Sequence, residues 1–189
     1  MDIAIDVTNT ILETERLIIR TWQESDLDDF YAYASVPGVG EMAGWPHHQS
    51  IDTSRQILEK FMAGKNEFAL YHKGDKKVIG SLGIHSSWAN EDDEFKHLKL
   101  KEIGFVLSKA YWGQGLMPEA VKVVINYCFT QLGLDALTCG HFKSNPQSRR
   151  VIEKCGFKYL KDDIFYSNQL DKHFDDMKYI LHKQTHPKG

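Results

Sequence analysis

Hydrophobic and polar residues alternate in some stretches of the chain and recur with helical spacing in others. Residues 16–22, "RLIIRTW", alternate and are rich in branched side chains, which predicts a strand. Residues 24–35 begin with acidic residues and carry an apolar face, which predicts a helix. That face consists of Leu27, Phe30, Tyr31 and Ala34.

The next segments predict a loop, a helix and a hairpin. Residues 36–50 are rich in Pro and Gly, as is typical of a loop. Residues 51–64 predict a helix with Ile57, Leu58 and Phe61 facing inward and with a terminal glycine. Residues 67–88 predict two strands around the turn "KGDKK", and residues 89–99 form a charged connection.

The second half alternates strands and helices before a closing pair of strands. We expect strands over 102–108 and 136–142, helices over 118–132 and 145–156, and paired strands over 157–167 and 175–183. The longer helix repeats apolar residues at i, i+3, i+4 and i+7, which marks its buried face. These residues are Met117, Ala120, Val121, Val124, Ile125, Cys128 and Leu132.

This order of elements predicts a single mixed α/β domain. A chain of 189 residues is long enough for one core and short for two. The strand before residue 113 and the strand after Gly133 are joined by a helix. We therefore expect these two strands to be parallel, with a right-handed crossover.

Composition and charge exclude several classes of protein. A net charge of -3 argues against a nucleic-acid surface, because phosphate binding needs a basic field. The N-terminus "MDIAIDVTNT" is acidic, and no apolar run reaches the ~20 residues of a membrane span. We therefore expect no signal peptide, no membrane partner and a cytoplasmic protein. Three scattered cysteines without a Cys-x-x-Cys pair predict neither disulfides nor a zinc site, and we expect no metal.

A turn with two glycines precedes the longer helix and raises the question of what it binds. Gly113 and Gly115 lie just before Pro118, which suits a first helical turn because the amides there have no partner. Free N–H groups at a helix N-terminus form an anion site. A tight turn would explain the two glycines equally well. The sequence has no Gly-Lys-Ser/Thr to end a Walker loop, and it lacks the third glycine of a Rossmann fingerprint.

Four motifs in this order resemble the GCN5-related N-acetyltransferase (GNAT) family, in the branch of the ribosomal-protein alanine acetyltransferases. "AYWGQG" at 110–115 is similar to the pyrophosphate loop Arg/Gln-x-x-Gly-x-Gly/Ala, with Ala110 where Arg or Gln is usual. Residues 12–31, 145–157 and 175–181 resemble the opening strand and helix, the Asn-x-x-Ser segment and the closing strand of the branch. The resemblance covers residues 12–182 as one domain, with terminal extensions 1–11 and 183–189.

The resemblance implies a fold and a cosubstrate. The GNAT fold is a mixed, mostly antiparallel twisted sheet of about six or seven strands, with helices on both faces and two central parallel strands splayed around the cofactor. Acetyl-CoA would bind with its pyrophosphate on the loop and its pantetheine arm along the preceding strand. The implied contacts are Trp112, Gly113, Gln114, Gly115, Leu116 and Met117 in the loop, Phe105, Val106 and Leu107 in the strand, and Asn145 and Ser148 near the thiol.

The resemblance also implies catalytic and acceptor residues. Acetyl transfer needs a neutral amine, a donor to the thioester oxygen and a proton for the thiolate. We expect a backbone N–H near Val106 or Leu107 as the oxyanion donor, Glu102 as the group that takes the amine proton, and Ser148, with Tyr166 in reserve, as the acid. Glu102 can equally be an ordinary polar strand residue, and Asn145 can be only a helix N-cap. The candidate acceptor contacts are Trp45, His47, Ser81 and Trp88.

The acceptor is the least determined part of this interpretation. An α-amine with a pKa of about 7.7 to 8.0 is more easily neutral than a lysine amine near about 10.4, which favours a protein or peptide N-terminus. A small-molecule amine such as a polyamine, an amino acid or an aminoglycoside remains the alternative. A non-catalytic acyl-CoA sensor with the same fold is the rival class. A monomer and a homodimer are both compatible with the sequence.

Overall fold

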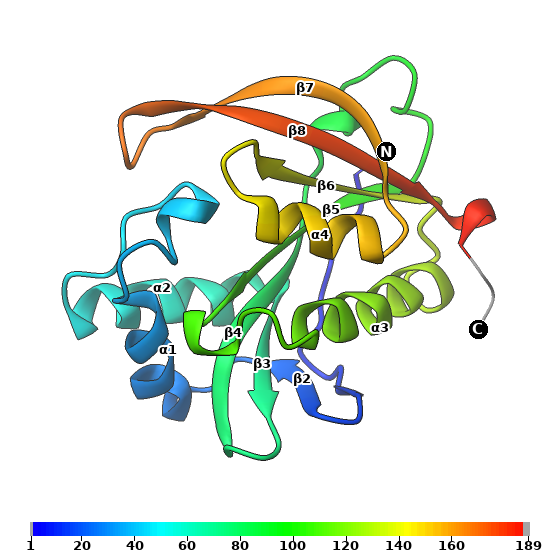
Figure 1. Ribbon diagram of the computed structural model, residues 1–189. Coiled ribbons are helices and arrows are strands. Elements are labelled where there is room, and N and C mark those ends of the chain that lie inside the picture. Colours follow the sequence, from blue (N-terminus) through cyan, green and yellow to red (C-terminus); the bar gives the residue numbers. More distant parts are fainter. Residues whose placement is uncertain (1, 187–189) are drawn as a thin grey trace.

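The computed structural model describes residues 2–186 and contains one eight-stranded sheet with the order β1-β2-β3-β4-β5-β6-β8-β7 (Figure 1). Neighbouring strands are antiparallel except β5 and β6, which are parallel. The mostly antiparallel mixed sheet that the sequence predicts is confirmed. The strands are β1 Leu12–Glu13, β2 Leu17–Thr21, β3 Glu67–His72, β4 Lys77–His85, β5 Leu100–Leu107, β6 Ala136–Phe142, β7 Lys158–Ser167 and β8 Lys172–His182.

Four α-helices cover the two faces of the sheet, as expected. They are α1 Leu27–Ala34, α2 Ile51–Gly64, α3 Leu116–Thr130 and α4 Pro146–Lys154. Short 3-10 turns occur at η1 Glu24–Asp26, η2 Glu41–Ala43, η3 Trp88–Asn90, η4 Lys109–Tyr111 and η5 Lys183–Thr185.

Alternation along the strands builds one core on each face. Phe68 and Leu70 of β3 pack with the buried sides of α3 and α4, whereas Ala69, between them, packs with α1 and α2. Successive strand residues point to opposite faces, so one strand supplies both cores. The apolar stripe predicted for α3 is buried from Met117 to Cys128.

Helix α3 begins at Leu116, two residues before the expected start at Pro118. Gly115 precedes it with a left-handed φ of 78°, so the glycine turn runs directly into the helix. Pro118 is tolerated because the amides of the first turn have no partner within the helix.

The parallel strands β5 and β6 are paired over only three positions. Leu100, Lys101 and Glu102 lie opposite Ala136, Leu137 and Thr138, and beyond them the strands separate. The Ser108 amide donates to the Ile79 carbonyl on the β4 side, whereas the Leu107 carbonyl accepts from the Trp112 side chain. Backbone groups alternate in direction along a strand, so those of residues 103, 105 and 107 face the gap. The predicted splay of the two central strands is confirmed.

The sheet has eight strands rather than the expected six or seven, because two residues, Leu12 and Glu13, form the additional strand β1. The N-terminal residues before β1 pack on the domain: Val7 is fully buried and its amide donates to Lys65. The Asp2 carboxylate lies 2.6 Å from the Lys101 ammonium. Of the expected terminal extensions, residues 1 and 187–189 lie outside the described residues.

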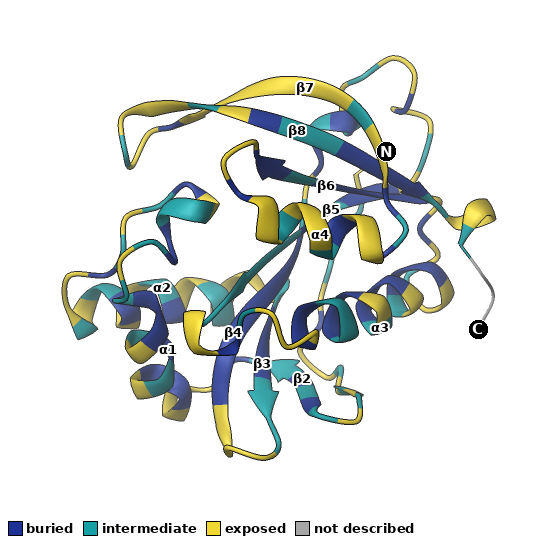
Figure 2. Ribbon diagram, viewed as in Figure 1, coloured by how far each residue is buried: buried dark blue, intermediate teal, exposed yellow. Residues whose placement is uncertain are grey.

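Strand β7 closes one edge of the sheet and is exposed along most of its length (Figure 2). With β8 it forms a long hairpin that arches past β6 and α4 (Figure 1). Within residues 2–186, no helix is long and apolar enough to cross a bilayer.

Candidate active site

The glycine loop holds the start of α3 in an open turn. Gly113 and Gly115 have φ angles of 77° and 78°, a region that side chains rarely adopt. No heavy atom lies within 4 Å of the position that a Gly113 Cβ would take. The Trp112 indole donates to the Leu107 carbonyl at 2.8 Å, which fixes the loop against the end of β5. The free amides of the first turn are therefore presented at the positive end of the helix dipole.

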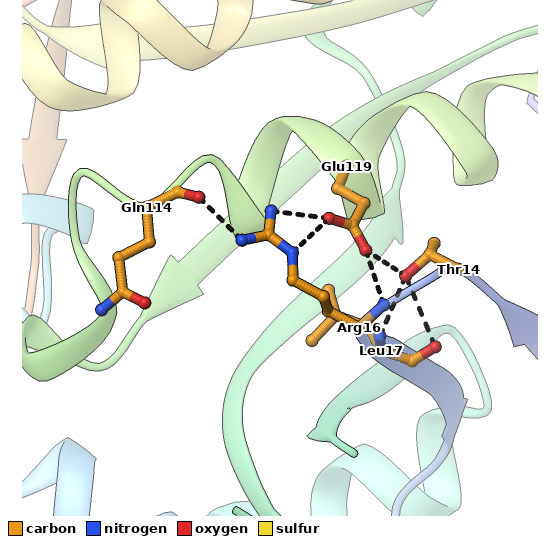
Figure 3. A network of polar contacts seen from close by, with 5 residues as sticks. All are labelled: Thr14, Arg16, Leu17, Gln114 and Glu119. Carbon is orange, nitrogen blue, oxygen red and sulfur yellow. Dashed lines mark hydrogen bonds and ion pairs between the residues drawn. The ribbon is translucent and has the colours of Figure 1, made fainter. Parts of the chain in front are cut away.

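A polar network ties this loop to the turn between β1 and β2 (Figure 3). The Arg16 guanidinium donates to the Gln114 carbonyl at 3.0 Å and to the Glu119 carboxylate at 2.8 Å. The Arg16 amide and the Thr14 hydroxyl also donate to Glu119. Burial opposes ionisation of Glu119, but these hydrogen bonds lower its pKa. This network has no local signal in the sequence, because its members lie about one hundred residues apart. It neutralises the Glu119 carboxylate beside the N-terminus of α3.

Two cavities meet at the gap between β5 and β6. The smaller has a volume of about 240 Å³ and lies between the end of β5, the loop and α4, whereas the larger has a volume of about 600 Å³ and lies over the sheet. Residues that line both are Met42, Ala43, Phe105, Val106 and Ser148.

The smaller cavity brings together most of the residues expected to bind acetyl-CoA. Gln114 is the exception, because its side chain turns back to the Ala110 carbonyl. Helix α4 adds two cations, Arg150 and Lys154, to the wall. The expected residues that line it are Phe105, Val106, Leu107, Trp112, Gly113, Gly115, Leu116, Met117, Asn145 and Ser148.

Asn145 both caps α4 and orients Ser148. Its carboxamide oxygen accepts from the Ser148 amide at 3.1 Å, and its nitrogen donates to the Ser148 hydroxyl oxygen at 2.9 Å. The same nitrogen reaches the Met42 carbonyl at 3.3 Å. Since the Ser148 oxygen accepts from Asn145, its own proton is free to donate into the junction of the two cavities.

Charged side chains from β3, β4, β5 and β8 line the larger cavity. Glu67 lies 3.1 Å from His85, and Asp176 lies 2.8 Å from Lys178. Among the described residues, Glu102 is the one carboxylate of this cavity without a hydrogen bond or ion pair. Burial raises the pKa of Glu102, against the opposing charges of Lys178 and His85.

Aromatic side chains form another part of the lining of the larger cavity. They come from α1, α2, the loop after η2, β5, β6 and β7. His48 also lines the wall, donates to or accepts from Ser54 at 2.7 Å, and has its pKa lowered by burial. The aromatic residues are Phe30, Trp45, Phe61, Phe105, Phe142 and Phe165.

Besides Gln114, the structure places three further expected residues outside these cavities. His47 bonds to Glu41 at 2.7 Å, and this contact holds together the loop between α1 and α2. Its neighbour His48 lines the larger cavity instead. Tyr166 bonds to Asp171 on the exposed side of the hairpin, because strand alternation turns Phe165 toward the cavity.

Trp88 is the third expected residue outside the cavities. It packs against Phe95 beside β5, under the Lys161 ammonium. Trp45 and Ser81, by contrast, line the larger cavity.

The arrangement suits a ligand with an anionic group, an extended arm and a reactive end. The loop amides would face the anionic group, and the unpaired edge of β5 offers backbone hydrogen bonds to the arm. Ser148 lies at the junction of the two cavities, and Glu102 lines the larger cavity beyond it. Within residues 2–186, no group of three His, Cys, Asp or Glu side chains is arranged to hold a metal ion.

Comparisons with known proteins identify the family. Residues 16–158 match the model of the acetyltransferase (GNAT) domain. The chain is 29% identical over 153 residues to the uncharacterized N-acetyltransferase YoaA of Bacillus subtilis, covering 78% of this chain and 82% of that one.

Three solved structures share the fold. A GNAT-family acetyltransferase of Bacillus anthracis has a TM-score of 0.79 at 21% identity, over 93% of this chain and 99% of that one. The ribosomal-protein-S5-alanine acetyltransferase of Vibrio fischeri has a TM-score of 0.68 at 19% identity, over 95% and 100%. The spermidine N-acetyltransferase of Vibrio cholerae, in complex with CoA and spermine, has a TM-score of 0.70 at 16% identity, over 90% and 98%. The chain belongs to the GNAT family of N-acetyltransferases, which use acetyl-CoA as cosubstrate.

Proposed function

We propose that this N-acetyltransferase acetylates a primary amine and that its preferred acceptor is the α-amine of a protein or peptide N-terminus. The carrying observation is the unpaired Glu102 carboxylate, which lines the larger cavity where β5 and β6 separate. It offers one ammonium group a charged partner beside the junction with the smaller cavity.

The loop and the free edge of β5 hold the cosubstrate in this proposal. The amides of residues 112–117 bind the pyrophosphate, and Arg150 and Lys154 of α4 add positive charge to the same cavity. Acetyl-CoA supplies the thioester. The N–H groups of Phe105 and Leu107 face the gap, whereas that of Val106, one of the two expected donors, faces β4. In this proposal, one of the two gap-facing amides stabilises negative charge on the thioester oxygen.

Two side chains move protons in the proposed reaction. Glu102 accepts the proton of the acceptor ammonium, directly or through water, which leaves a neutral nucleophile. Ser148, whose proton is not used by Asn145, donates to the departing sulfur. Tyr166 is not assigned this role, because its hydroxyl bonds to Asp171 outside the cavities.

The charge balance of the larger cavity supports a single-ammonium acceptor. His85 and Lys178 already pair with Glu67 and Asp176, so only Glu102 is left for the substrate. A polyamine brings further ammonium groups, and each is costly to bury without its own partner. An α-amine is also closer to neutrality near pH 7 than a lysine amine.

A small-molecule amine is the second candidate, supported by the size of the site. A cavity of about 600 Å³ lies within the roughly 300–1,000 Å³ typical of small-molecule pockets. Its aromatic wall would pack against an apolar body. The spermidine N-acetyltransferase that shares the fold belongs to this class by its name.

An acceptor screen tests the proposal. Purified protein with acetyl-CoA is offered an N-terminal peptide library, free amino acids, polyamines and aminoglycosides, with thiol release and product mass as readouts. We expect acetylation at peptide α-amines. Acetylation of small amines with every peptide untouched would overturn the N-terminal assignment, and acetyl-CoA binding without turnover would favour the sensor.

A further inference from the structure

A carboxylate and an imidazole that the sequence analysis did not single out lie across the sheet beside Glu102. Glu67 on β3, Gly83 on β4 and Gly104 on β5 form one row of directly opposed residues. His85 lies two residues beyond Gly83 and directly opposite Glu102. Glu67, His85 and Glu102 all line the larger cavity.

The two glycines leave the space that the pair occupies. A Cβ at Gly83 would lie 2.3 Å from both the Glu67 Oε1 and the His85 Nε2 atoms. A Cβ at Gly104 would lie 3.4 Å from the His85 ring. Gly83 and Gly104 therefore leave room for the Glu67–His85 pair, and any larger residue at position 83 would displace it.

The Glu67 carboxylate holds the ring of His85 at one nitrogen, with its Oε1 atom 3.1 Å from Nε2. The other nitrogen, Nδ1, lies 3.3 Å from the Asn66 carboxamide nitrogen, which donates to the Ile84 carbonyl at 3.1 Å. Both nitrogens of a charged ring donate, so Glu67 is the partner that holds the charged form. The Glu67 side chain is only 11% exposed, so water screens its charge weakly.

Charged groups on every neighbouring strand act on this pair and on Glu102. Burial disfavours the charged ring of His85, but the hydrogen bond and charge of Glu67, with Glu102, raise its pKa. Lys101 on β5 opposes that shift. Around Glu102, Lys178 and His85 favour the carboxylate, whereas burial and Asp176 oppose it. Cys139 of β6 also lies within reach of the Glu102 charge.

We propose that His85 is a positioning residue for acetyl transfer: Glu67 holds its charged ring opposite Glu102, where it stabilises the carboxylate that receives the acceptor proton. The inference rests on the proposed function for its catalytic meaning. The effect of His85 on the charge of Glu102 is a property of the folded protein without substrate, so it can be measured without turnover.

Carboxyl titration by NMR tests the electrostatic part. The Glu102 signal is assigned by its loss in Glu102→Gln and followed against pH in the wild type, His85→Gln and His85→Lys. We expect the Glu102 midpoint to rise by about one pH unit in His85→Gln, since an opposite charge at close range lowers a carboxyl pKa by about 1–3 units. His85→Lys should restore most of the wild-type midpoint, because the charge returns.

A second titration tests the role of Glu67. In Glu67→Gln, the ring signal of His85 should titrate about one pH unit lower, because the imidazolium loses its anionic partner. The matched control is His97→Gln, which removes an exposed histidine on the loop before β5. It should leave the Glu102 midpoint where it is in the wild type.

Turnover supplies the functional arm. The acid limb of the kcat/KM profile should move to higher pH in His85→Gln and return in His85→Lys, with acetyl-CoA affinity unchanged. An unmoved Glu102 midpoint in folded His85→Gln would overturn the proposal, as would an unmoved His85 midpoint in Glu67→Gln. If the wild type turns over no acceptor, the proposed function fails, while the two titrations still decide whether the pair stabilises Glu102.

Discussion

Single residues in this protein can be tested with substitutions matched in conformation. Gly115 and Gly133 flank α3 and have φ angles of 78° and 65°. Gly115 lines the smaller cavity, whereas Gly133 has no heavy atom within 4 Å of its Cβ position and lies beyond the other end of the helix. Substitutions at these two glycines therefore distinguish the effect of backbone strain from the effect of a lost ligand contact.

We predict that Gly115→Ala and Gly133→Ala lower the free energy of unfolding similarly, by about 1–2 kcal/mol, because each places a side chain in a left-handed conformation. Only Gly115→Ala should weaken acetyl-CoA binding, by about tenfold or more, since its backbone approaches the pyrophosphate. Calorimetry measures the affinity and denaturant unfolding the stability. Equal affinity in the two variants would remove the loop from the binding site.

We expect Glu102→Gln to act in opposite directions on catalysis and on stability. In Glu102→Gln we expect kcat/KM to fall by about 10²–10⁴-fold near neutral pH, the usual contribution of a general base. The loss should shrink as pH rises, because more of the acceptor is already neutral. Acetyl-CoA affinity should stay at the wild-type value, and a pH–rate profile parallel to that of the wild type would argue against the role.

The stability effect of the same variant has a definite sign. Burial raises the pKa of Glu102 in the folded state, so the folded protein holds this proton more tightly than the unfolded chain. Stability is therefore lost as pH rises from the unfolded pKa through the folded one. Glu102→Gln should melt at a higher temperature than the wild type at pH 7–8, and the difference should vanish at pH below about 4.

At the scale of elements, the turn between β1 and β2 supports the loop that precedes α3. Arg16 in this turn contacts the Gln114 carbonyl and the Glu119 carboxylate together (Figure 3), so one side chain joins the turn, the loop and the helix. Because the Gln114 carbonyl points to Arg16, the N–H groups of the loop are left to face a bound anion. The loop is therefore positioned by a turn 98 residues earlier in the chain.

We predict that Arg16→Met weakens acetyl-CoA binding by about tenfold, equivalent to about 1.4 kcal/mol, and leaves kcat at saturating acetyl-CoA nearly unchanged. The KM for acetyl-CoA should rise accordingly. Arg55→Met is the control, because Arg55 is exposed on α2 and pairs only loosely with Asp52 at 3.8 Å. A fall in kcat with KM unaffected would place Arg16 in the chemistry rather than in loop support.

Most helices and strands could be predicted from local hydrophobic periodicity. The features that could not be predicted depend on the register between strands that are distant in the sequence. The stripe of α3 and the alternation of β2 are visible in the sequence because each repeats within a few residues. Strand β1 is only two residues long and exists through its pairing with β2, so no pattern announces it. The loop residues 112–117 were recognisable because an anion site at a helix start is contiguous in sequence.

The larger cavity could not be read in the same way. Glu67, His85, Asp176 and Lys178 come from three strands, and only the register of β3, β4 and β8 in one sheet brings them beside Glu102. A shift of one residue along a strand changes the face, which is why Phe165 rather than Tyr166 lines the cavity.

At the scale of the whole molecule, the sheet has two parts that are joined by a short parallel pairing between β5 and β6, called the seam below. Strands β1 to β5 form one part and β6, β8 and β7 the other, and only the pairing of residues 100–102 with 136–138 joins them within the sheet. The smaller cavity lies across the opening of this seam, with β5 and the loop on one side and α4 on the other. A ligand seated there contacts both parts.

We predict that acetyl-CoA slows amide hydrogen exchange on both sides of the seam. At one hundred times its dissociation constant, a ligand stabilises the folded state by about 2.7 kcal/mol, and amides that open locally at the site report that gain. Protection should rise in residues 105–107 and 112–117 and also in 145–151, which begin α4. The loop at 91–97, which lines neither cavity, should exchange as before. Protection confined to 112–117 would show that the ligand rests on the loop alone and does not enter the gap between β5 and β6.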